Sequence, residues 1–118
     1  MSVAAQEALL LHRLLRDHAW ESEPLAGLAT AFFAEARGLI ETPWLLSAVP
    51  DFVFPKTQGQ RPPDLDRRLQ FGRALNRLAA EDADVHRRML EVLHLVKPPS
   101  ILHDPELVRR VEAVMKAT

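Results

Sequence analysis

Apolar side chains recur at steps of three and four residues along most of the chain, which is the spacing of amphipathic helices. The first such segment runs from Val3 to His18, and within it Arg13, Arg16 and Asp17 are expected to face water. The opposite side of this segment carries Leu10, Leu11, Leu14, Leu15 and His18. We therefore predict one long helix over residues 3–18, with this stripe against a core.

Prolines set the predicted bounds of the second apolar segment. Ser22 can cap a helix because its hydroxyl accepts hydrogen bonds from first-turn amide groups, and Pro24 fits that turn. The stripe of this helix comprises Leu25, Leu28, Phe32, Ala36 and Leu39. Thr42-Pro43 repeats the signal ahead of a short apolar turn that Pro50 stops, since the residue before a proline avoids the helical region. A helix followed by a separate turn is predicted.

The segment from Asp51 to Pro63 is where proline and glycine interrupt the helical pattern. Within it, Phe52 and Phe54 alternate as they would in an extended strip. We predict a loop rather than a sheet strand. It is expected to cross the helices with Phe52 or Phe54 inserted between them.

Acidic residues mark the starts of the three remaining predicted helices. One begins near Asp64, the next is capped by Asp82 or Asp84, and the last begins at Asp104. A carboxylate at the last two of these helix starts binds free amide groups and complements the helix dipole. The chain is thus predicted to be all-α, a single small helical domain over residues 1–118 with about five helices and one proline-rich extended crossing segment.

Composition and charge narrow the classes of partner. A chain of 118 residues can bury a core of useful size, and 47% apolar with 26% charged residues is globular composition. The 15 basic and 16 acidic residues are interspersed, so a net charge of -1 offers no basic field to nucleic acid or to an anionic membrane. No apolar run approaches the ~20 residues of a membrane span. We expect a cytoplasmic protein with no nucleic-acid or membrane partner.

No residue pattern in the chain predicts catalysis or metal binding. The five histidines include no pair spaced four apart, as a helix would need to present two ligands to zinc. The acidic cluster Glu81, Asp82 and Asp84 could serve acid-base chemistry or hold a cation, but its place before an apolar helix favours capping. Four arginines could line an anion groove, yet they alternate with acids opposite the leucines and are interpreted as a solvated face: Arg67, Arg68, Arg73 and Arg77.

One stretch, Met1 to Ala8, resembles part of the flavoprotein monooxygenases of the para-hydroxybenzoate hydroxylase type. In that family the last flavin motif ends in Gly-Gln-Gly-Met and a long helix follows, and Met1 to Ala8 looks like the start of that helix. The second stretch is similar in order and spacing to the tail of certain bacterial FAD-dependent oxidoreductases. It comprises Pro43-Trp44, Asp51, Phe54-Pro55, Gly59, Arg61-Pro62-Pro63, His94-Leu95, Pro98-Pro99-Ser100, Leu102 and Pro105.

The resemblance implies the carboxy-terminal helical part of a larger FAD-dependent monooxygenase or oxidoreductase, without its dinucleotide-binding half. In the complete fold, Met1 and Ser2 would lie where the helix start faces the flavin. Trp44, Phe52 and Phe54 would line or support the substrate side, although core filling explains these aromatic side chains equally well. No catalytic residue is implied, and the isolated chain is expected to hold no cofactor.

Two function classes follow from this resemblance. The chain is either a part of a flavin monooxygenase that needs the missing half, or a free-standing helical interaction module. Apolar residues cover more of the first helix than a surface helix needs, and they include Val3, Ala4, Ala8 and Leu11. We therefore expect a partner, either the missing flavin-binding half or a second copy in a two-fold homo-oligomer.

Overall fold

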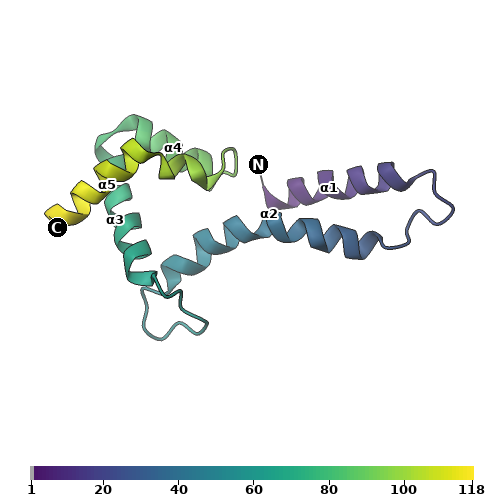
Figure 1. Ribbon diagram of the computed structural model, residues 1–118, viewed down its shortest axis with the longest axis horizontal. Helices are drawn as coiled ribbons and strands as arrows, with labels where there is room; N and C mark the ends of the chain where they lie inside the picture. Colours follow the sequence, from purple (N-terminus) through teal and green to yellow (C-terminus); the bar gives the residue numbers. More distant parts are fainter. Residues whose placement is uncertain (1) are drawn as a thin grey trace. The chain divides into compact units, whose positions relative to one another are not determined.

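The computed structural model describes residues 2–118, and these residues are helical with short connections. The elements are α1 (Val3–His18), α2 (Leu28–Asp51), α3 (Leu65–Glu81), α4 (Ala83–Leu93), the 3-10 turn η1 (Pro99–His103) and α5 (Pro105–Ala117), shown in Figure 1. No strand forms within the described part of the chain. The predicted all-α class with about five helices is confirmed.

The chain divides into two compact units. The first, Met1–Trp44, holds α1 and most of α2 and is called the hairpin unit below. The second, Leu45–Thr118, holds the end of α2, a loop and helices α3 to α5, and is called the three-helix unit. A single domain over the whole chain stays a prediction.

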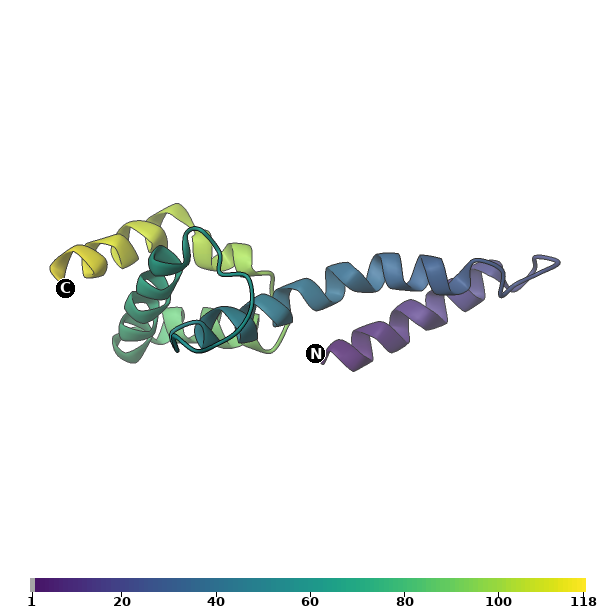
Figure 2. The same cartoon turned by 90° about the horizontal axis from the view of Figure 1, so that it is seen from below.

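In the hairpin unit, α1 and α2 run antiparallel and lie side by side in both views (Figures 1 and 2). The Ser2 hydroxyl caps α1 by accepting a hydrogen bond from the amide of Ala5 at 3.2 Å. Leu10 and Leu14 of α1 are buried against Ala36 of α2. Partly buried apolar side chains complete this cluster: Leu28, Ala31, Phe32 and Leu39. The core of the hairpin is therefore a single narrow seam between two helices.

The second helix differs from its prediction at both ends. It begins at Leu28 rather than near Ser22, after Gly27 turns the chain with a φ of +70°, a conformation that glycine adopts without strain. It then continues through Pro43 and Pro50 to Asp51, so the predicted break into a separate turn is wrong. A proline inside a helix removes one amide donor. The backbone on both sides of each proline remains helical, so α2 continues through both positions.

The loop that follows α2 is held together by Arg61. Its guanidinium group donates to the carbonyl oxygens of Phe52 at 2.6 Å and Phe54 at 3.0 Å, and it lies 5.0 Å from the centre of the Phe52 ring. Gly59 has a φ of +134°, and a side chain there would meet the Phe52 ring. Phe52 thus packs within its own loop, and Phe54 is exposed. Neither belongs to a core cluster between helices, so the predicted insertion of one of them is wrong.

The three-helix unit has the larger core. Val85 of α4 and Val111 of α5 are almost completely buried and meet α3. The other buried members are Ala74, Leu75, Ala79 and Leu107. Helix α3 packs against both α4 and α5, and η1 contacts the latter two. The ring of Phe71 stacks on His103 of η1 at 5.6 Å, which ties that turn to α3.

The predicted caps of the last two helices are confirmed. Asp82 caps α4, with its Oδ1 atom accepting from the amides of Asp84 at 2.9 Å and Val85 at 3.3 Å. Asp104 caps α5 by accepting from the amide of Leu107 at 3.3 Å. Each carboxylate uses donors that the first turn of a helix leaves unpaired.

Candidate functional site

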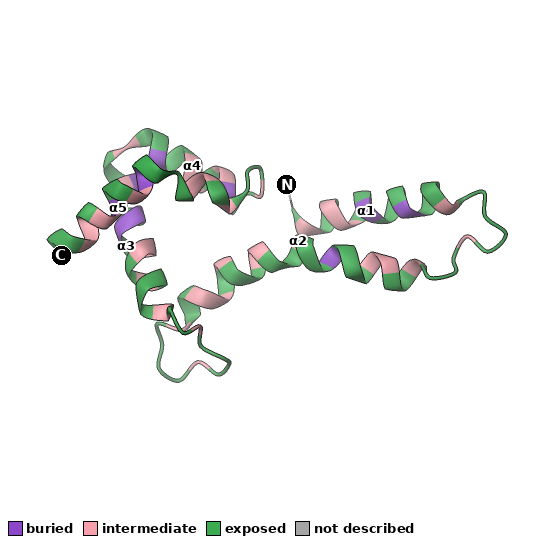
Figure 3. Cartoon of the chain, in the orientation of Figure 1, coloured by how far each residue is buried: buried purple, intermediate pink, exposed green. Residues whose placement is uncertain are grey.

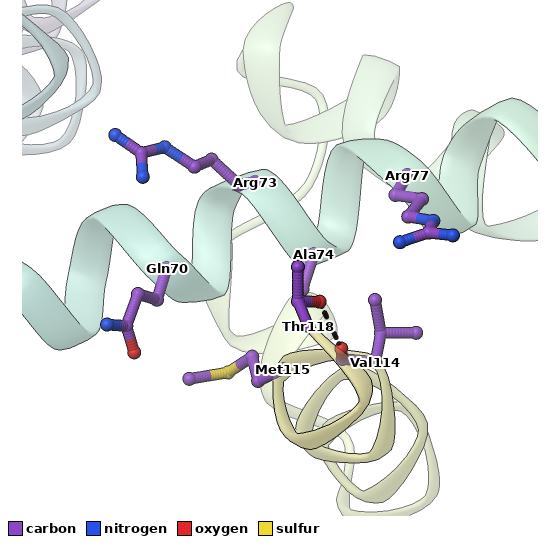
Figure 4. Close-up of a pocket in the computed structure, with 7 residues that line it drawn as sticks. All are labelled: Gln70, Arg73, Ala74, Arg77, Val114, Met115 and Thr118. Atoms are coloured by element: carbon purple, nitrogen blue, oxygen red, sulfur yellow. Dashed lines mark hydrogen bonds between the residues drawn. The ribbon is translucent and has the colours of Figure 1, made fainter.

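A pocket of about 360 Å³ lies between α3 and α5 in the three-helix unit (Figure 4). Its lining residues are Gln70, Arg73, Ala74, Arg77, Val114, Met115 and Thr118. Ala74 is buried, Val114 and Met115 are half-buried, and the Thr118 hydroxyl donates to the carbonyl oxygen of Val114 at 2.7 Å. The floor of the pocket is apolar, and its polar groups stand at the rim.

The two rim arginines of this pocket do not form an anion site. Arg73 and Arg77 lie one turn apart on α3, and Figure 4 shows their guanidinium groups pointing in different directions. Both are exposed, as the sequence predicts for a solvated face. The other two arginines of that face form ion pairs with acids: Arg67 with Glu112 and Arg68 with Asp64. The pocket can accept a small apolar group, but it presents no paired acid and base.

A shallower hollow lies at the start of α4, beside Asp82 and His86. An ion-pair network surrounds it, because Asp84 binds Arg87 and also Arg88, the latter at 2.9 Å. The Arg87 hydrogen bond lowers the pKa of the Asp84 carboxyl. The Arg110 hydrogen bond, followed by two backbone amides, lowers the pKa of Asp82. Carboxyls with lowered pKa values are ionised near neutral pH, so they suit capping and pairing rather than proton donation.

The described residues contain no group of three or more His, Asp or Glu side chains that could hold a metal ion. The chain has no cysteine to add to such a group. The acidic cluster before α4 is engaged with arginines and backbone amides, as described above. A metal centre is therefore not among the candidate sites that these residues form.

The four described residues that the resemblance singles out do not line either hollow. Met1 lies outside the described residues, and Ser2 caps α1. Trp44 is 67% exposed on α2 and Phe54 is 64% exposed on the loop, while Phe52 is covered by Arg61 and Gly59. Their proposed roles toward a flavin or a substrate stay predictions.

The hairpin unit has an exposed apolar surface that the residue pattern predicts only in part. It is formed by Ala8, Leu11, Leu15, Phe33, Ile40 and Trp44, and is called the apolar face below. Ala4 is exposed next to Ala8, whereas Val3 is half-buried. In Figure 3 the buried residues of this unit lie between the two helices, and the outward surfaces are exposed.

The α2 half of the apolar face went unnoticed in the sequence because its members stand beside the core stripe. Phe33, Ile40 and Trp44 are spaced by seven and four residues, which is the spacing of a second stripe on the same helix. On α1 the apolar spacing predicts one broad stripe that includes Leu10, Leu11, Leu14 and Leu15. The structure divides that stripe into a buried half and an exposed half.

Comparison with known proteins adds no further constraint. No family model, no curated protein and no solved structure matches this chain. Among the described residues, no helix has the length and apolar character needed to span a membrane.

Proposed function

We propose that this chain is a non-catalytic helical part of an FAD-dependent monooxygenase or oxidoreductase, which works only with a flavin-binding half. The proposal rests on the contacts and positions of residues that match the flavoprotein tail. Arg61 fastens the loop through the carbonyls of Phe52 and Phe54, and Pro99 opens η1. Residues that match the flavoprotein tail in order and spacing thus act as scaffold, which is the role of a tail that supports a separate cofactor domain.

The start of α1 fits a place beside a flavin. Within the described part of the chain, the Ser2 hydroxyl accepts from the amide of Ala5 and not from those of Val3 and Ala4. Free amides at a helix start favour negative charge, and a flavin carries such charge when reduced. In this proposal the flavin supplies the redox chemistry, and the α1 amides help to stabilise its charge. The other half supplies the dinucleotide site.

The test begins with the DNA immediately upstream of the coding sequence. The proposal expects it to encode a dinucleotide-binding half that ends in Gly-Gln-Gly. That half and this chain, expressed together with a tag on this chain alone, should co-purify as a yellow complex with flavin in a one-to-one ratio. A flavin-binding half that is stable and fully active without this chain would refute the proposal, as would an upstream region without such a half.

A free-standing interaction module is the second candidate function. The apolar face of the hairpin unit favours it, because an exposed surface of this kind on a soluble protein marks a contact with another protein. This function requires no flavin. It is distinguished from the first by what binds to the purified chain when no flavin-binding half is present.

A further inference from the structure

The two halves of the apolar face lie on the same side of the hairpin. Consecutive residues of an α-helix are turned by about 100°. On α1, Leu11 and Leu15 follow the buried Leu10 and Leu14 by one residue each, so they are rotated by that angle from the seam. On α2, Phe33 and Ile40 likewise follow the seam residues Phe32 and Leu39 by one residue each. They are therefore rotated from the seam by the same angle and in the same direction along the chain. Since the helices run antiparallel, equal rotations bring both stripes to one side.

The opposite side of the hairpin confirms this geometry. Arg13 of α1 and Glu35 of α2 stand one residue before Leu14 and Ala36, so they are rotated the other way from the seam. These two side chains form an ion pair across the helices. The hairpin therefore has one side closed by an ion pair and one side that is apolar.

The apolar face is large for a surface that only meets water. Phe33 is 70% exposed and Trp44 is 67% exposed. Leu11, Leu15 and Ile40 are each exposed by about two-fifths. With full aromatic side chains contributing 150–250 Å² each, the face presents roughly 500 Å² of apolar surface. Soluble monomers rarely expose a contiguous apolar patch beyond a few hundred Å².

We propose that a second copy of this chain covers the apolar face, so that two hairpins form a four-helix bundle about a two-fold axis. A layer of two helices with one apolar side can bury that side against a second layer of the same kind, which gives a four-helix bundle. Pairing two such faces buries roughly 1,000 Å² in total, which is about the smallest area expected of a biological interface. The same patch serves both partners, as two-fold symmetry requires. This inference holds without the flavin assignment.

The oligomeric state of the full chain is the first test. Multi-angle light scattering, across a tenfold dilution and with no other protein present, should give twice the monomer mass of 13.3 kDa at the upper concentrations. A constant mass of 13.3 kDa would overturn the inference. It would leave the flavin proposal untouched, since that proposal concerns a different polypeptide partner and is read out by co-purification.

Matched variants then show which face makes the contact. Leu11→Glu and Phe33→Glu should each shift the protein to a monomer while the helical circular dichroism remains. Leu9→Glu is the control, because Leu9 is 60% exposed on the same helix but points away from the apolar face. A dimer that survives both test variants, or that only Leu9→Glu dissociates, contradicts the inference.

A proximity measurement covers the case in which a glutamate variant fails to fold. The chain contains no cysteine, so one introduced cysteine is a unique attachment site. Leu15→Cys labelled with pyrene should show excimer emission from two neighbouring copies, and Leu9→Cys should not. Excimer emission from Leu9→Cys alone would place the contact on another surface and overturn the inference.

Discussion

Asp82 uses its two carboxylate oxygens for two different helices. Its Oδ1 atom caps α4, and its Oδ2 atom accepts a hydrogen bond from Nη2 of Arg110 on α5 at 2.7 Å. The amide of Asp82 also donates to the carbonyl oxygen of Leu78 at 2.9 Å, which closes α3. One residue therefore joins the end of α3, the start of α4 and the middle of α5 around the larger core.

Variants of this junction should separate capping from ion pairing. Asp82→Ala removes both functions and is expected to lower the melting temperature by several degrees. Asp82→Asn retains an oxygen that can cap α4, so it should cost less. Arg110→Met removes only an exposed ion pair and should cost least, because such pairs contribute little to stability. Thermal unfolding of the three variants checks this order, and a larger loss for Arg110→Met than for Asp82→Ala would contradict it.

The stability of the three-helix unit should fall on acidification. The pKa of Asp82 is lowered chiefly by Arg110, and the pKa of Asp84 is lowered chiefly by Arg87. A carboxyl with a lowered folded-state pKa stabilises the fold above its unfolded-state pKa of about 3.9, and this stabilisation is lost as the pH falls through the folded value. Melting temperatures between about pH 6 and pH 2 should therefore decline below about pH 5.

The acid sensitivity has its own control. In an Asp82→Asn and Asp84→Asn double variant, the decline should be shallower because two of the titrating groups are gone. Added salt should also reduce the difference between this variant and the parent, since exposed charge pairs are screened. An identical pH profile in both proteins would show that these carboxyls do not control the transition.

Two leucines of the three-helix unit differ in burial, so replacing them by alanine should change the free energy of unfolding by different amounts. Leu75 is 5% exposed, and Leu75→Ala should lower the free energy of unfolding by about 2–5 kcal/mol because it leaves a cavity. Leu93 is 55% exposed, and Leu93→Ala should change it by less than about 0.5 kcal/mol. Chemical denaturation measures both. Equal costs would mean that the packing around Leu75 is not as described.

The loop after α2 should depend on the shape of the Arg61 side chain. A lysine carries the same charge but has no planar fork with which to bind the Phe52 and Phe54 carbonyls together. Arg61→Lys is expected to accelerate amide hydrogen exchange in residues 52–61 while leaving α3 to α5 unchanged. Arg73→Lys, on an exposed face, is the matched control and should alter neither region. Unchanged exchange in Arg61→Lys would show that another contact holds the loop.

The isolated chain is expected to be colourless. Holding the adenosine part of FAD takes a βαβ unit with a glycine turn and an acidic ribose ligand, which the all-α fold of the described residues does not provide. The absorbance spectrum of the purified chain, after incubation with excess FAD and desalting, should therefore lack flavin bands. Stoichiometric yellow absorbance would contradict the expectation.

Local sequence patterns predict a helix boundary correctly where the boundary depends only on residues of that helix. The bounds of α1 and the caps at Asp82 and Asp104 were predicted correctly, because capping needs only an acidic side chain and nearby amides. Pro43 was misinterpreted as the start of a new element. A proline weakens a helix locally, and whether the helix continues depends on the bonds and packing on both sides of it.

The candidate surface was harder to predict because burial depends on the partner helix. The periodicity of α1 places both Leu10 and Leu11 in the stripe that should face a core. The position of Ala36 on the partner helix decides that Leu10 is the one covered. Phe52 is a similar case. Its spacing from Phe54 suggests an extended strip, whereas the contact with Arg61 comes from nine residues further along the chain.

In the proposed two-fold bundle, the ion pair between Arg13 and Glu35 would also limit further assembly. A helical hairpin that was apolar on both sides could receive one neighbour on each side, and such stacking continues into open fibres. Here the second side of the hairpin carries the Arg13–Glu35 ion pair, with the exposed Leu9 one turn before Arg13. In the proposed bundle this mixed side offers no continuous apolar surface comparable with the apolar face, so growth is expected to stop at two chains.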